Sequence, residues 1–409
     1  MRLLFLSHYF PPEVNAPANR VLEVCREWVR LGHEVHVVTC FPSHPQGVLY
    51  DGWAMSLHGR ETVEGIHVHR VPTILGANRG YGRRIVNYLS FVPGAVWRAL
   101  RLGRFDGIVA TSPQFFCAVA GGLAGLLKRT PWVFELRDLW PDSIVAVGAA
   151  RPSLAIRMLE TLELALYRHA RGVVCVTPAF VENLVSRGID RGKLAFVPNG
   201  VDAAFWAAPA DGPGWRARRG FMPSDVLVSF VGTIGMAHGV GTVLDAAARL
   251  AGPLPGVRFL LVGEGAERAS LEAQAERRGL GNVAFTGLVP RAEVRDVMAA
   301  TDVSLVLLRD LPVFRTVLPT KMFEAMAAGR PVVLGVDGEA RRVLEASGGG
   351  VFVPPESVDA LVEAVTSLVA SPERRHALGE RGRSFVLREY DRGVWARRYA
   401  EVLAGWLVG

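Results

Sequence analysis

The chain has 409 residues, of which 50% are hydrophobic and 21% are charged, with a formal net charge of +7. This composition excludes a disordered chain, and the length favours two domains over one. The four cysteines, Cys25, Cys40, Cys117 and Cys175, are scattered without a CxxC pair. They indicate buried thiols in a reducing compartment, not a disulfide framework or a zinc site.

The first half of the chain alternates apolar, β-branched runs with helical stretches. Strands are expected at residues 3–7, 35–39, 66–71, 107–112, 132–136, 172–177 and 194–199. Helices are expected between several of them, for instance from Ala18 to Leu31 and from Ser153 to His169. The uncharged stretch 107–127 is long enough to raise the question of a membrane span, but Ser-Pro-Gln interrupts it at 112–114. A strand, a turn and a buried helix are therefore expected there.

The pattern restarts after residues 204–224, which are rich in Pro, Gly and Ala. Further strands are expected at 226–235, 257–265, 283–287, 303–308, 331–335 and 350–354. The sequence thus predicts an α/β protein with two Rossmann-like domains, 1–203 and 225–373, joined by a linker region at 204–224 and followed by helices at 374–409. A ligand is expected in a cleft at the carboxyl ends of both sheets.

A basic segment lies in the first domain, because no Asp or Glu occurs from Gly65 to Phe105. The window contains Arg70, Arg79, Arg83, Arg84, Arg98, Arg101 and Arg104, interleaved with Tyr81, Tyr88, Phe91 and Trp97. This pattern favours contact with an anionic membrane surface; a solvated basic face beside a buried helix is the alternative. The window has no nucleic-acid recognition motif, so no nucleic-acid partner is expected.

The most specific segment is LPTKMFEAMAAGRPVVLG at 318–335. Pro319 and Thr320 mark a helix start, with Thr320 expected as the N-cap. The free amides of such a helix start can bind an anion such as a diphosphate, and Lys321 adds a positive charge. Glu324, about one turn later, can accept paired hydrogen bonds from the hydroxyls of a ribose. The alternative is a surface lysine and a glutamate that stabilises the helix dipole.

Polar residues also follow a buried strand of the first domain, in RDLWPDS at 137–143. Asp138 could orient or deprotonate an acceptor hydroxyl, and Arg137 could pair with a phosphate or a carboxylate. An Arg–Asp ion pair that locks the loop is the alternative. Candidates for acceptor or phosphate contacts are Trp140, Asp142 and, in the loop after the first strand, Glu13, Asn15 and Arg20.

PTKMFEAMAAGRPVV resembles the signature of the family-4 retaining glycosyltransferases of the GT-B fold. Other segments that resemble this family are FPPEVNAPANR, PNGVD, FVGTIG, LLVGEG and FTGLVP. RDLWPDS is similar to the branch that includes bacterial O-antigen N-acetylfucosaminyl and colanic-acid fucosyl transferases. The resemblance covers essentially the whole chain. It implies two facing Rossmann-like domains, with C-terminal helices that cross back to the first.

This resemblance also implies an activity and its partners. The expected reaction is metal-independent hexosyl transfer from a nucleotide sugar to a lipid-linked or saccharide acceptor, without a cofactor. The expected place is the cytoplasmic side, peripheral on the inner face of the cell membrane. Glu324 would hold the ribose, and Lys321 with the amides around Pro319 and Thr320 would meet the diphosphate. The remaining donor contacts would come from Gly263, Glu264, Gly265 and, at the base, Leu288.

Two departures from the family pattern bear on the donor. Thr316 stands where the family has a second carboxylate, and Thr233 and His238 stand where it often has Arg and Lys. The phosphate charge is then expected from Arg315, Lys321 or a protonated His238, with a structural histidine as the alternative. Because a threonine offers no bidentate acceptor, the site is not expected to be built around the hydroxyls of glucose or mannose. The resemblance to the O-antigen branch implies a UDP-linked N-acetylated 6-deoxyhexosamine as the donor.

Absences in the sequence shape the remaining alternatives. No D-x-D triplet occurs, which disfavours a metal-dependent transferase fold. A dehydrogenase is disfavoured because GEGAER, at 263–268, has Arg268 in place of the third glycine. A sugar-nucleotide epimerase on the same fold and an inactive nucleotide-sugar binder remain open.

Overall fold

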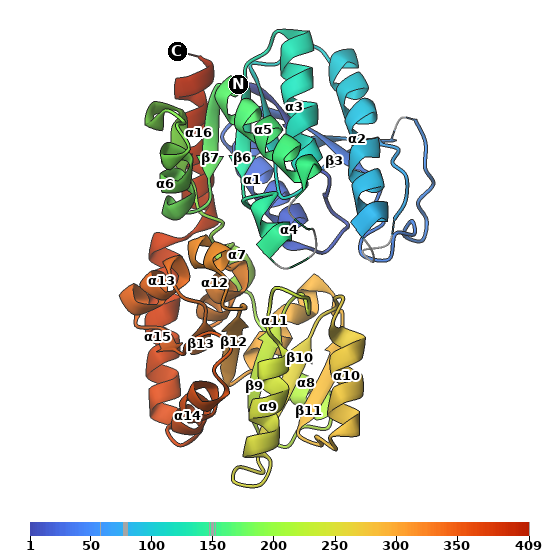
Figure 1. The fold of residues 1–409 in the computed structure, drawn as a ribbon. Coiled ribbons are helices and arrows are strands. Elements are labelled where there is room, and N and C mark those ends of the chain that lie inside the picture. Colours follow the sequence, from blue (N-terminus) through green and yellow to red (C-terminus); the bar gives the residue numbers. More distant parts are fainter. Residues whose placement is uncertain (58, 77–80, 147, 149–150, 152, 409) are drawn as a thin grey trace. The chain divides into compact units, whose positions relative to one another are not determined.

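The computed structural model describes residues 1–57, 59–76, 81–146, 148, 151 and 153–408, with only the backbone of Tyr81, Gly82 and Arg84. It divides into two compact units, Met1–Asn199 with Arg392–Gly409, and Gly200–Asp391. Each unit is a mostly parallel sheet with helices on both faces (Figure 1). The predicted class, an α/β protein with two Rossmann-like domains, is confirmed.

The first unit holds an eight-stranded sheet. Its strands are β1 (Arg2–Leu6), β2 (Glu34–Cys40), β3 (Gly59–Val63), β4 (Ile66–Val71), β5 (Gly107–Thr111), β6 (Trp132–Leu136), β7 (Gly172–Cys175) and β8 (Leu194–Phe196). The strand order is β3-β4-β2-β1-β5-β6-β7-β8, and only β3 runs antiparallel to its neighbour. β3 is the one strand of this sheet that the sequence did not predict.

Helices connect these strands. They are α1 (Ala16–Arg30), α2 (Tyr81–Arg101), α3 (Phe115–Lys128), α4 (Asp142–Ala146), α5 (Leu154–His169), α6 (Pro178–Ser186), the 3-10 helix η1 (Arg191–Lys193) and the last helix of the chain, α16 (Arg392–Leu407). The uncharged stretch 107–127 forms β5, a turn and α3, as predicted. Within the described residues, no helix is both long and apolar enough to cross a membrane.

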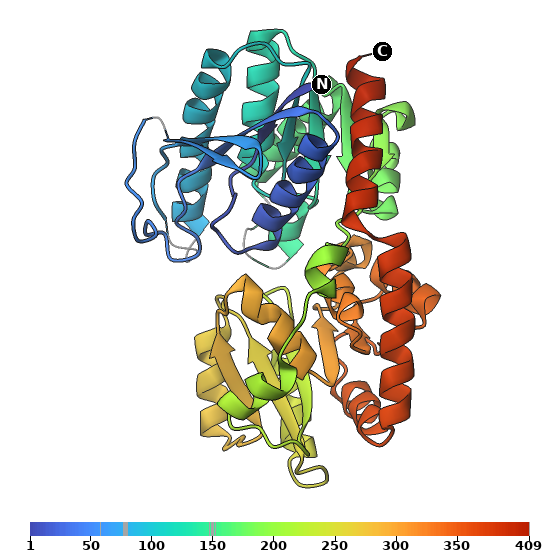
Figure 2. The same cartoon turned by 180° about the vertical axis from the view of Figure 1, so that it is seen from behind.

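Two layers of helices cover the first sheet. α1 and α16 lie side by side on one face (Figure 2), where the indole of Trp28 donates a 3.0 Å hydrogen bond to the carbonyl of Ala396. The buried Arg392 pairs with Glu23 and so ties α16 to α1. α2, α3 and α5 lie on the opposite face, with α3 in the middle.

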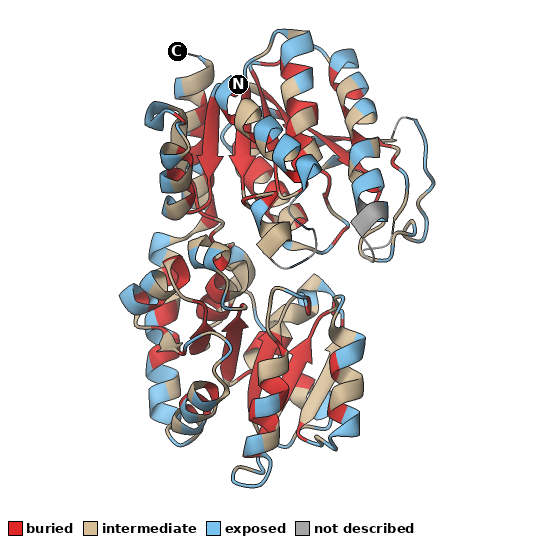
Figure 3. Cartoon of the chain, in the orientation of Figure 1, coloured by how far each residue is buried: buried red, intermediate tan, exposed pale blue. Residues whose placement is uncertain are grey.

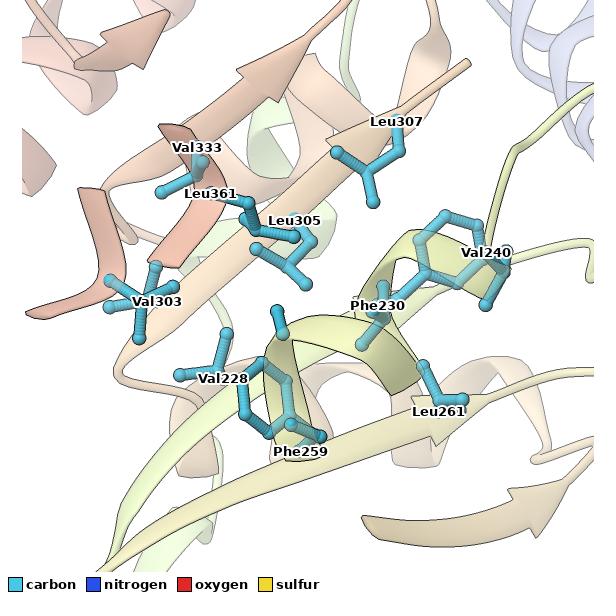
Figure 4. Close-up of a cluster of buried hydrophobic side chains, with 14 of the residues drawn as sticks. Val228, Phe230, Val240, Phe259, Leu261, Val303, Leu305, Leu307, Val333 and Leu361 are labelled. Carbon is cyan, nitrogen blue, oxygen red and sulfur yellow. The ribbon is translucent and has the colours of Figure 1, made fainter. Parts of the chain in front are cut away.

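The second unit holds a six-stranded parallel sheet. Its strands are β9 (Val226–Val231), β10 (Val257–Val262), β11 (Val283–Gly287), β12 (Val303–Leu307), β13 (Val332–Gly335) and β14 (Gly350–Phe352), in the order β11-β10-β9-β12-β13-β14. Buried side chains of β9, β10 and β12 form a core under the helices (Figure 4). In both units the central strands are almost wholly buried, whereas the edge strands β3, β8, β11 and β14 are only partly buried (Figure 3).

Part of the segment that was expected as a linker forms helices of the second unit. They are α7 (Ala203–Ala207), α8 (Gly212–Arg218), α9 (Gly241–Leu250), α10 (Arg268–Arg277), α11 (Arg291–Ala300), the 3-10 helix η2 (Pro312–Thr316), α12 (Thr320–Ala327), α13 (Glu339–Ser347), α14 (Val358–Val369) and α15 (Pro372–Glu389). α7 and α8 lie within the predicted linker region almost entirely. Asp211 caps α8, and Trp215, only 1% exposed, packs into a core cluster. Pro and Gly residues can stand at the start of a helix, as they do in α8. The composition of this region therefore did not reveal these helices.

The C-terminal helices also divide differently from the predicted boundary at residue 374. α15 packs against α12, α13 and α14 of the second unit, and only α16 returns to the first unit. The boundary therefore falls between Asp391 and Arg392. The buried Arg392–Glu23 pair and the Trp28 hydrogen bond account for this return.

The basic window from Gly65 to Phe105 is only partly a surface. Arg70 and Arg98 are 1% and 3% exposed, so their predicted place on a basic surface is wrong. Arg70 donates to Glu61 at 2.6 Å, and Arg98 donates to His69 at 2.9 Å. Arg83, Arg101 and Arg104 are exposed. Arg79 and the side chains of Arg84 and Tyr81 lie outside the described residues.

Candidate active site

Two loops follow the carboxyl ends of β9 and β10 in the second unit. β9 pairs with β10 on one side and with β12 on the other, so the strand order reverses at β9. Ligands of open α/β sheets bind at such a point. A Cβ atom on Gly263 would lie 2.0 Å from the carbonyl oxygen of Gly232, and one on Gly265 would lie 2.1 Å from that of Ile234. Both glycines are therefore required for the close approach of these two loops.

The start of α12 supplies uncapped amides. The helix begins at Thr320, and Pro319, with ψ of 124°, occupies the N-cap position without a side-chain hydrogen bond. The predicted N-cap role of Thr320 is thus wrong, because helical geometry already includes this residue. The amides of the first turn have no capping side chain, and an anion can satisfy them.

Lys321 places a cation beside these amides. Its Nζ lies 3.9 Å from the ring centroid of Phe230, in β9, and has no hydrogen-bond partner. It also lies 3.1 Å from the position that a Cβ on Gly232 would take. Burial lowers the pKa of Lys321 to about 7, although the charge of Glu324 opposes this shift. An unpaired, desolvated ammonium next to a bare helix start has the chemistry that suits an anion.

Glu324 lies one turn further along α12. Burial raises the pKa of its carboxyl group, and the charges of Arg291 and Lys321 oppose the increase. The other predicted donor contacts lie at the ends of neighbouring strands. Leu288 follows β11 and is 52% exposed, whereas the carboxylate of Glu264 pairs with Arg268.

His238 does not carry the positive charge considered for it. Burial lowers the pKa of His238 to about 3, and the charge of Lys321 lowers it further. Its Nδ1 lies 3.3 Å from the carbonyl oxygen of Gly235, which can only accept a hydrogen bond. Nδ1 therefore carries the proton, and Nε2 is left as an acceptor. The geometry favours the structural histidine over the phosphate donor.

Arg315 and Thr316, on η2, are engaged locally. Arg315 is exposed and forms a 3.3 Å ion pair with Asp310. The hydroxyl of Thr316 donates to the carbonyl of Val313 at 2.7 Å. Among the three residues considered for the phosphate charge, Lys321 is the one whose cation is both buried and without a hydrogen-bond partner.

A second polar group lies at the carboxyl ends of β5 and β6 in the first unit. The amide of Arg137 donates to the hydroxyl of Ser112 at 2.8 Å. Asp138 accepts a 2.9 Å hydrogen bond from the hydroxyl of Ser143, and burial raises the pKa of Asp138, with the charge of Asp142 adding to the increase. Ser143, rather than Arg137, therefore holds the Asp138 side chain.

The guanidinium of Arg137 is under-satisfied. Its Nε and Nη1 are buried without a hydrogen-bond partner, and burial lowers the pKa of Arg137 to about 10. The carboxylate of the nearby Glu135 forms its 2.8 Å ion pair with Arg20. Trp140, three residues after Arg137, stacks on Phe115 with ring centroids 4.7 Å apart. Arg137 thus keeps donors available for an anionic group.

Arg20 and Asn15 have structural roles in the first unit. Arg20, 2% exposed, donates to Glu135 at 2.8 Å and to the carbonyl of Pro198 at 2.7 Å. It joins α1, β6 and the segment after β8. The side chain of Asn15 caps α1 by accepting a 2.9 Å hydrogen bond from the amide of Ala18.

Glu13 is buried at 2% exposure in the loop after β1. Its Oε1 accepts hydrogen bonds from the amides of Ser43 and His44, at 3.0 and 2.9 Å, while Oε2 has no partner. Burial raises the pKa of Glu13 to about 7. His8, which the sequence analysis did not single out, also follows β1, and its Nε2 lies 2.9 Å from Oδ1 of Asn87.

Comparison with known proteins assigns both parts of the chain to known domains. Residues 15–200 match the model of a glycosyl transferase 4-like domain, and residues 213–385 match that of glycosyl transferases group 1. Together the two models cover most of the chain. The chain is a glycosyltransferase of the GT-B fold.

Individual relatives span the whole glycosyltransferase. A putative colanic acid biosynthesis glycosyl transferase of Escherichia coli K12 is 25% identical and covers 99% of this chain and 100% of its own. Sucrose-phosphate synthase from Thermosynechococcus elongatus has a TM-score of 0.78 at 19% identity, covering 100% of this chain and 99% of its own. Anabaena Alr3699/HepE in complex with UDP and glucose has a TM-score of 0.74 at 19% identity, covering 98% and 99%. At these identities the two structures show the fold.

Each of the two domains carries its own candidate residues. The group 1 domain holds Lys321 and Glu324, and the 4-like domain holds Arg137 and Asp138. The sequence did not predict that Lys321 would lie over the ring of Phe230, although FVGTIG has an aromatic residue before the turn. His8 had a weak signal, a polar residue directly after a buried strand.

Proposed function

We propose that this glycosyltransferase moves a sugar from a nucleoside diphosphate to a lipid-linked saccharide during assembly of a surface polysaccharide, with retention at the anomeric carbon. One observation carries the donor assignment: the unpaired ammonium of Lys321 lies beside the uncapped start of α12, with Glu324 one turn away. A cation and free amides suit a diphosphate, and a carboxylate suits the ribose hydroxyls. The similarity to a putative colanic acid transferase supports the polysaccharide assignment.

The reaction breaks the bond between the anomeric carbon and the diphosphate, so negative charge develops on the leaving group. Lys321 and the amides at Thr320 are the groups that would stabilise this charge, without a metal ion. Since Lys321 has a pKa of about 7 before the donor binds, a bound diphosphate would favour its protonated form. The binding of the donor would thus create the charge that the transition state needs.

The acceptor would bind to the 4-like domain. Asp138, oriented by Ser143, has the raised pKa of a group that can take a proton from an attacking hydroxyl. The unpartnered donors of Arg137 suit a phosphate of a lipid-linked acceptor. Glu13 is a second buried carboxyl group of the same domain, and its Oε2 has no hydrogen-bond partner.

We further assign the donor sugar to the N-acetylated 6-deoxyhexosamines, carried on UDP. Thr316 cannot act as a bidentate acceptor, and its hydroxyl already donates to Val313. A site built in this way lacks a carboxylate partner for the hydroxyls of glucose or mannose. Catalytic efficiency should therefore be higher with the UDP-linked deoxyhexosamine than with UDP-glucose or GDP-mannose.

We also place the enzyme at the inner face of the cell membrane, through α2, α3 and α5. These helices carry exposed apolar side chains at helical spacing: Val86, Leu89, Trp97 and Leu100 on α2, Leu123, Leu126 and Leu127 on α3, and Leu154, Met158 and Leu162 on α5. Arg101 lies over the ring of Trp97, 5.1 Å from its centroid. Exposed apolar side chains flanked by arginines suit an anionic bilayer surface.

Product analysis separates this function from its alternatives. The enzyme is incubated with each nucleotide sugar, with and without a lipid-linked saccharide, and the products are identified by mass spectrometry and NMR. A new α- or β-glycosidic bond that keeps the anomeric configuration of the donor supports a retaining transferase. An isomerised nucleotide sugar that forms without an acceptor would indicate an epimerase. Nucleotide-sugar binding without any product would indicate an inactive binder.

A further inference from the structure

A second cluster of ionisable side chains lies at the amino-terminal ends of β2 and β4, whereas Asp138 and Glu13 follow carboxyl ends of strands. The parallel register places His36 beside His67. Glu34 precedes His36 by two residues and so shares its face of β2. One ligand atom from each of Glu34, His36 and His67 lies within 4.8 Å of the other two. Because β2 and β4 are inner strands of the sheet, the backbone fixes this arrangement.

A chain of hydrogen bonds orients the imidazole of His36. Arg98, which can only donate, lies 2.9 Å from Nδ1 of His69. Nδ1 is therefore an acceptor, and Nε2 of His69 carries the proton that it donates to Nδ1 of His36 at 3.0 Å. Nε2 of His36 in turn donates to Oε1 of Glu34 at 2.8 Å. A proton thus occupies the position between His36 and Glu34.

We propose that Glu34, His36 and His67 form a binding site for a first-row transition-metal ion, with Zn²⁺ as the representative ion. The ion takes the place of the proton between Nε2 of His36 and the Glu34 carboxylate, and His67 supplies the third ligand. Water completes a tetrahedral site. His36 then carries its proton on Nδ1 and donates it to Nε2 of His69, and the proton of His69 moves to Nδ1, so both imidazoles stay neutral and the hydrogen bond from Arg98 to His69 is lost. The hydrogen bond from His36 to His69 then fixes the orientation of the ligand.

The ligand atoms select the class of ion. Arg2 forms a 2.9 Å ion pair with Glu34, and the charges of Arg60 and Arg98 act on His69, so the surroundings oppose every cation alike. Hard ions such as Mg²⁺ and Ca²⁺ take oxygen ligands, of which this cluster offers one carboxylate. Two imidazole nitrogens favour Zn²⁺, Ni²⁺ or Cu²⁺ instead. The site lies at the opposite strand ends from Asp138, so it is expected to stabilise the first unit and not to take part in transfer.

Metal titration of the full, tag-free chain tests this site. After treatment with a chelator, the protein is titrated with ZnCl₂ by calorimetry and thermal shift, with MgCl₂ as the comparison. Zn²⁺ is expected to saturate at one ion per chain and to raise Tm, and MgCl₂ to do neither. CoCl₂ is expected to give the visible absorption of a four-coordinate site. The chain has ten histidines, so site-specific variants are needed.

His67→Gln is the decisive variant, because His67 is exposed and its loss leaves the buried hydrogen-bond chain intact. Zn²⁺ affinity should fall by more than about tenfold. His169→Gln, which changes an exposed histidine on α5, should bind Zn²⁺ like the parent. If His67→Gln is destabilised, Glu34→Gln gives the same comparison. Absence of saturable binding at one ion per chain, or unchanged affinity in the folded His67→Gln protein, overturns the proposal.

Discussion

The ammonium of Lys321, on α12, lies 3.9 Å from the ring centroid of Phe230, on β9. The aromatic face attracts the cation, but it provides none of the hydrogen bonds that water would give. Lys321 therefore loses its proton more easily than an exposed lysine, and its pKa falls to about 7. A diphosphate would restore the missing partners, which links donor binding to protonation.

Donor affinity should depend on pH through Lys321. Because the free enzyme loses the ammonium with a pKa of about 7, the Kd for a UDP-sugar should rise about tenfold per pH unit above this value. A UDP-sugar is the right ligand, because its two phosphates keep their charge in this range. Isothermal titration between about pH 6 and 9 measures this dependence.

Two variants test the assignment to Lys321. Lys321→Met should bind weakly at every pH and lose the slope. Arg315→Met changes an exposed arginine that pairs with Asp310, and should keep the slope. The folded-state pKa of Lys321 is below its ordinary value, so protonation costs stability at low pH. Lys321→Met should therefore raise Tm most at about pH 6. A slope that survives in Lys321→Met would disprove the assignment.

Glu324→Ala should weaken donor binding while the fold remains. Loss of the carboxylate would leave the ribose hydroxyls without their acceptor, at a cost of about 1–3 kcal/mol. The Kd for the nucleotide should rise accordingly, and turnover should fall. Glu345→Ala, which removes an exposed glutamate from α13, serves as the control. Unchanged Kd in a folded Glu324→Ala protein would exclude the ribose role.

Asp138→Asn should reduce turnover more than donor affinity. An asparagine keeps the size of the side chain but cannot take a proton, so kcat should fall by about a hundredfold or more. The Kd for the nucleotide should change little. Glu182→Gln, at an exposed carboxylate of the same unit, should behave like the parent. A collapse of donor affinity with kcat preserved would contradict the acceptor-side role.

Activity should persist in EDTA. The proposed stabilisation of the diphosphate rests on Lys321 and the amides of α12, which need no metal ion. Initial rates are measured with EDTA and then with added Mg²⁺ or Mn²⁺. Restoration of a lost activity by Mg²⁺ would contradict the mechanism, and it would be distinct from any effect of Zn²⁺ at Glu34, His36 and His67.

Membrane binding should depend on the exposed arginines. Arg83, Arg101 and Arg104 changed together to Glu should reduce binding to anionic vesicles by at least about a hundredfold, at about 1 kcal/mol for each arginine lost. Binding of the parent should weaken as salt rises. The matched control changes Arg218, Arg342 and Arg388 of the second unit to Glu. Failure of the parent to sediment with phosphatidylglycerol vesicles at low salt would defeat the membrane assignment.

The sequence by itself determined where all strands but β3 lie along the chain and the position of the proposed diphosphate motif. Alternation of apolar runs with amphipathic helices is a local property, so β1, β9 and α12 could be predicted from their own residues. Lys321 and Glu324 lie one turn apart on a single helix, and their relationship needed no distant contact.

Only the tertiary structure decided which charges are exposed and which are neutral. Arg98 looks like a surface residue in a basic window, but it is buried against His69, 29 positions earlier. His238 stays neutral because folding buries it near Lys321. α16 joins the first unit because Arg392 meets Glu23, 369 positions away. Desolvation and pairing arise between segments far apart in the chain, and local patterns carry no information about them.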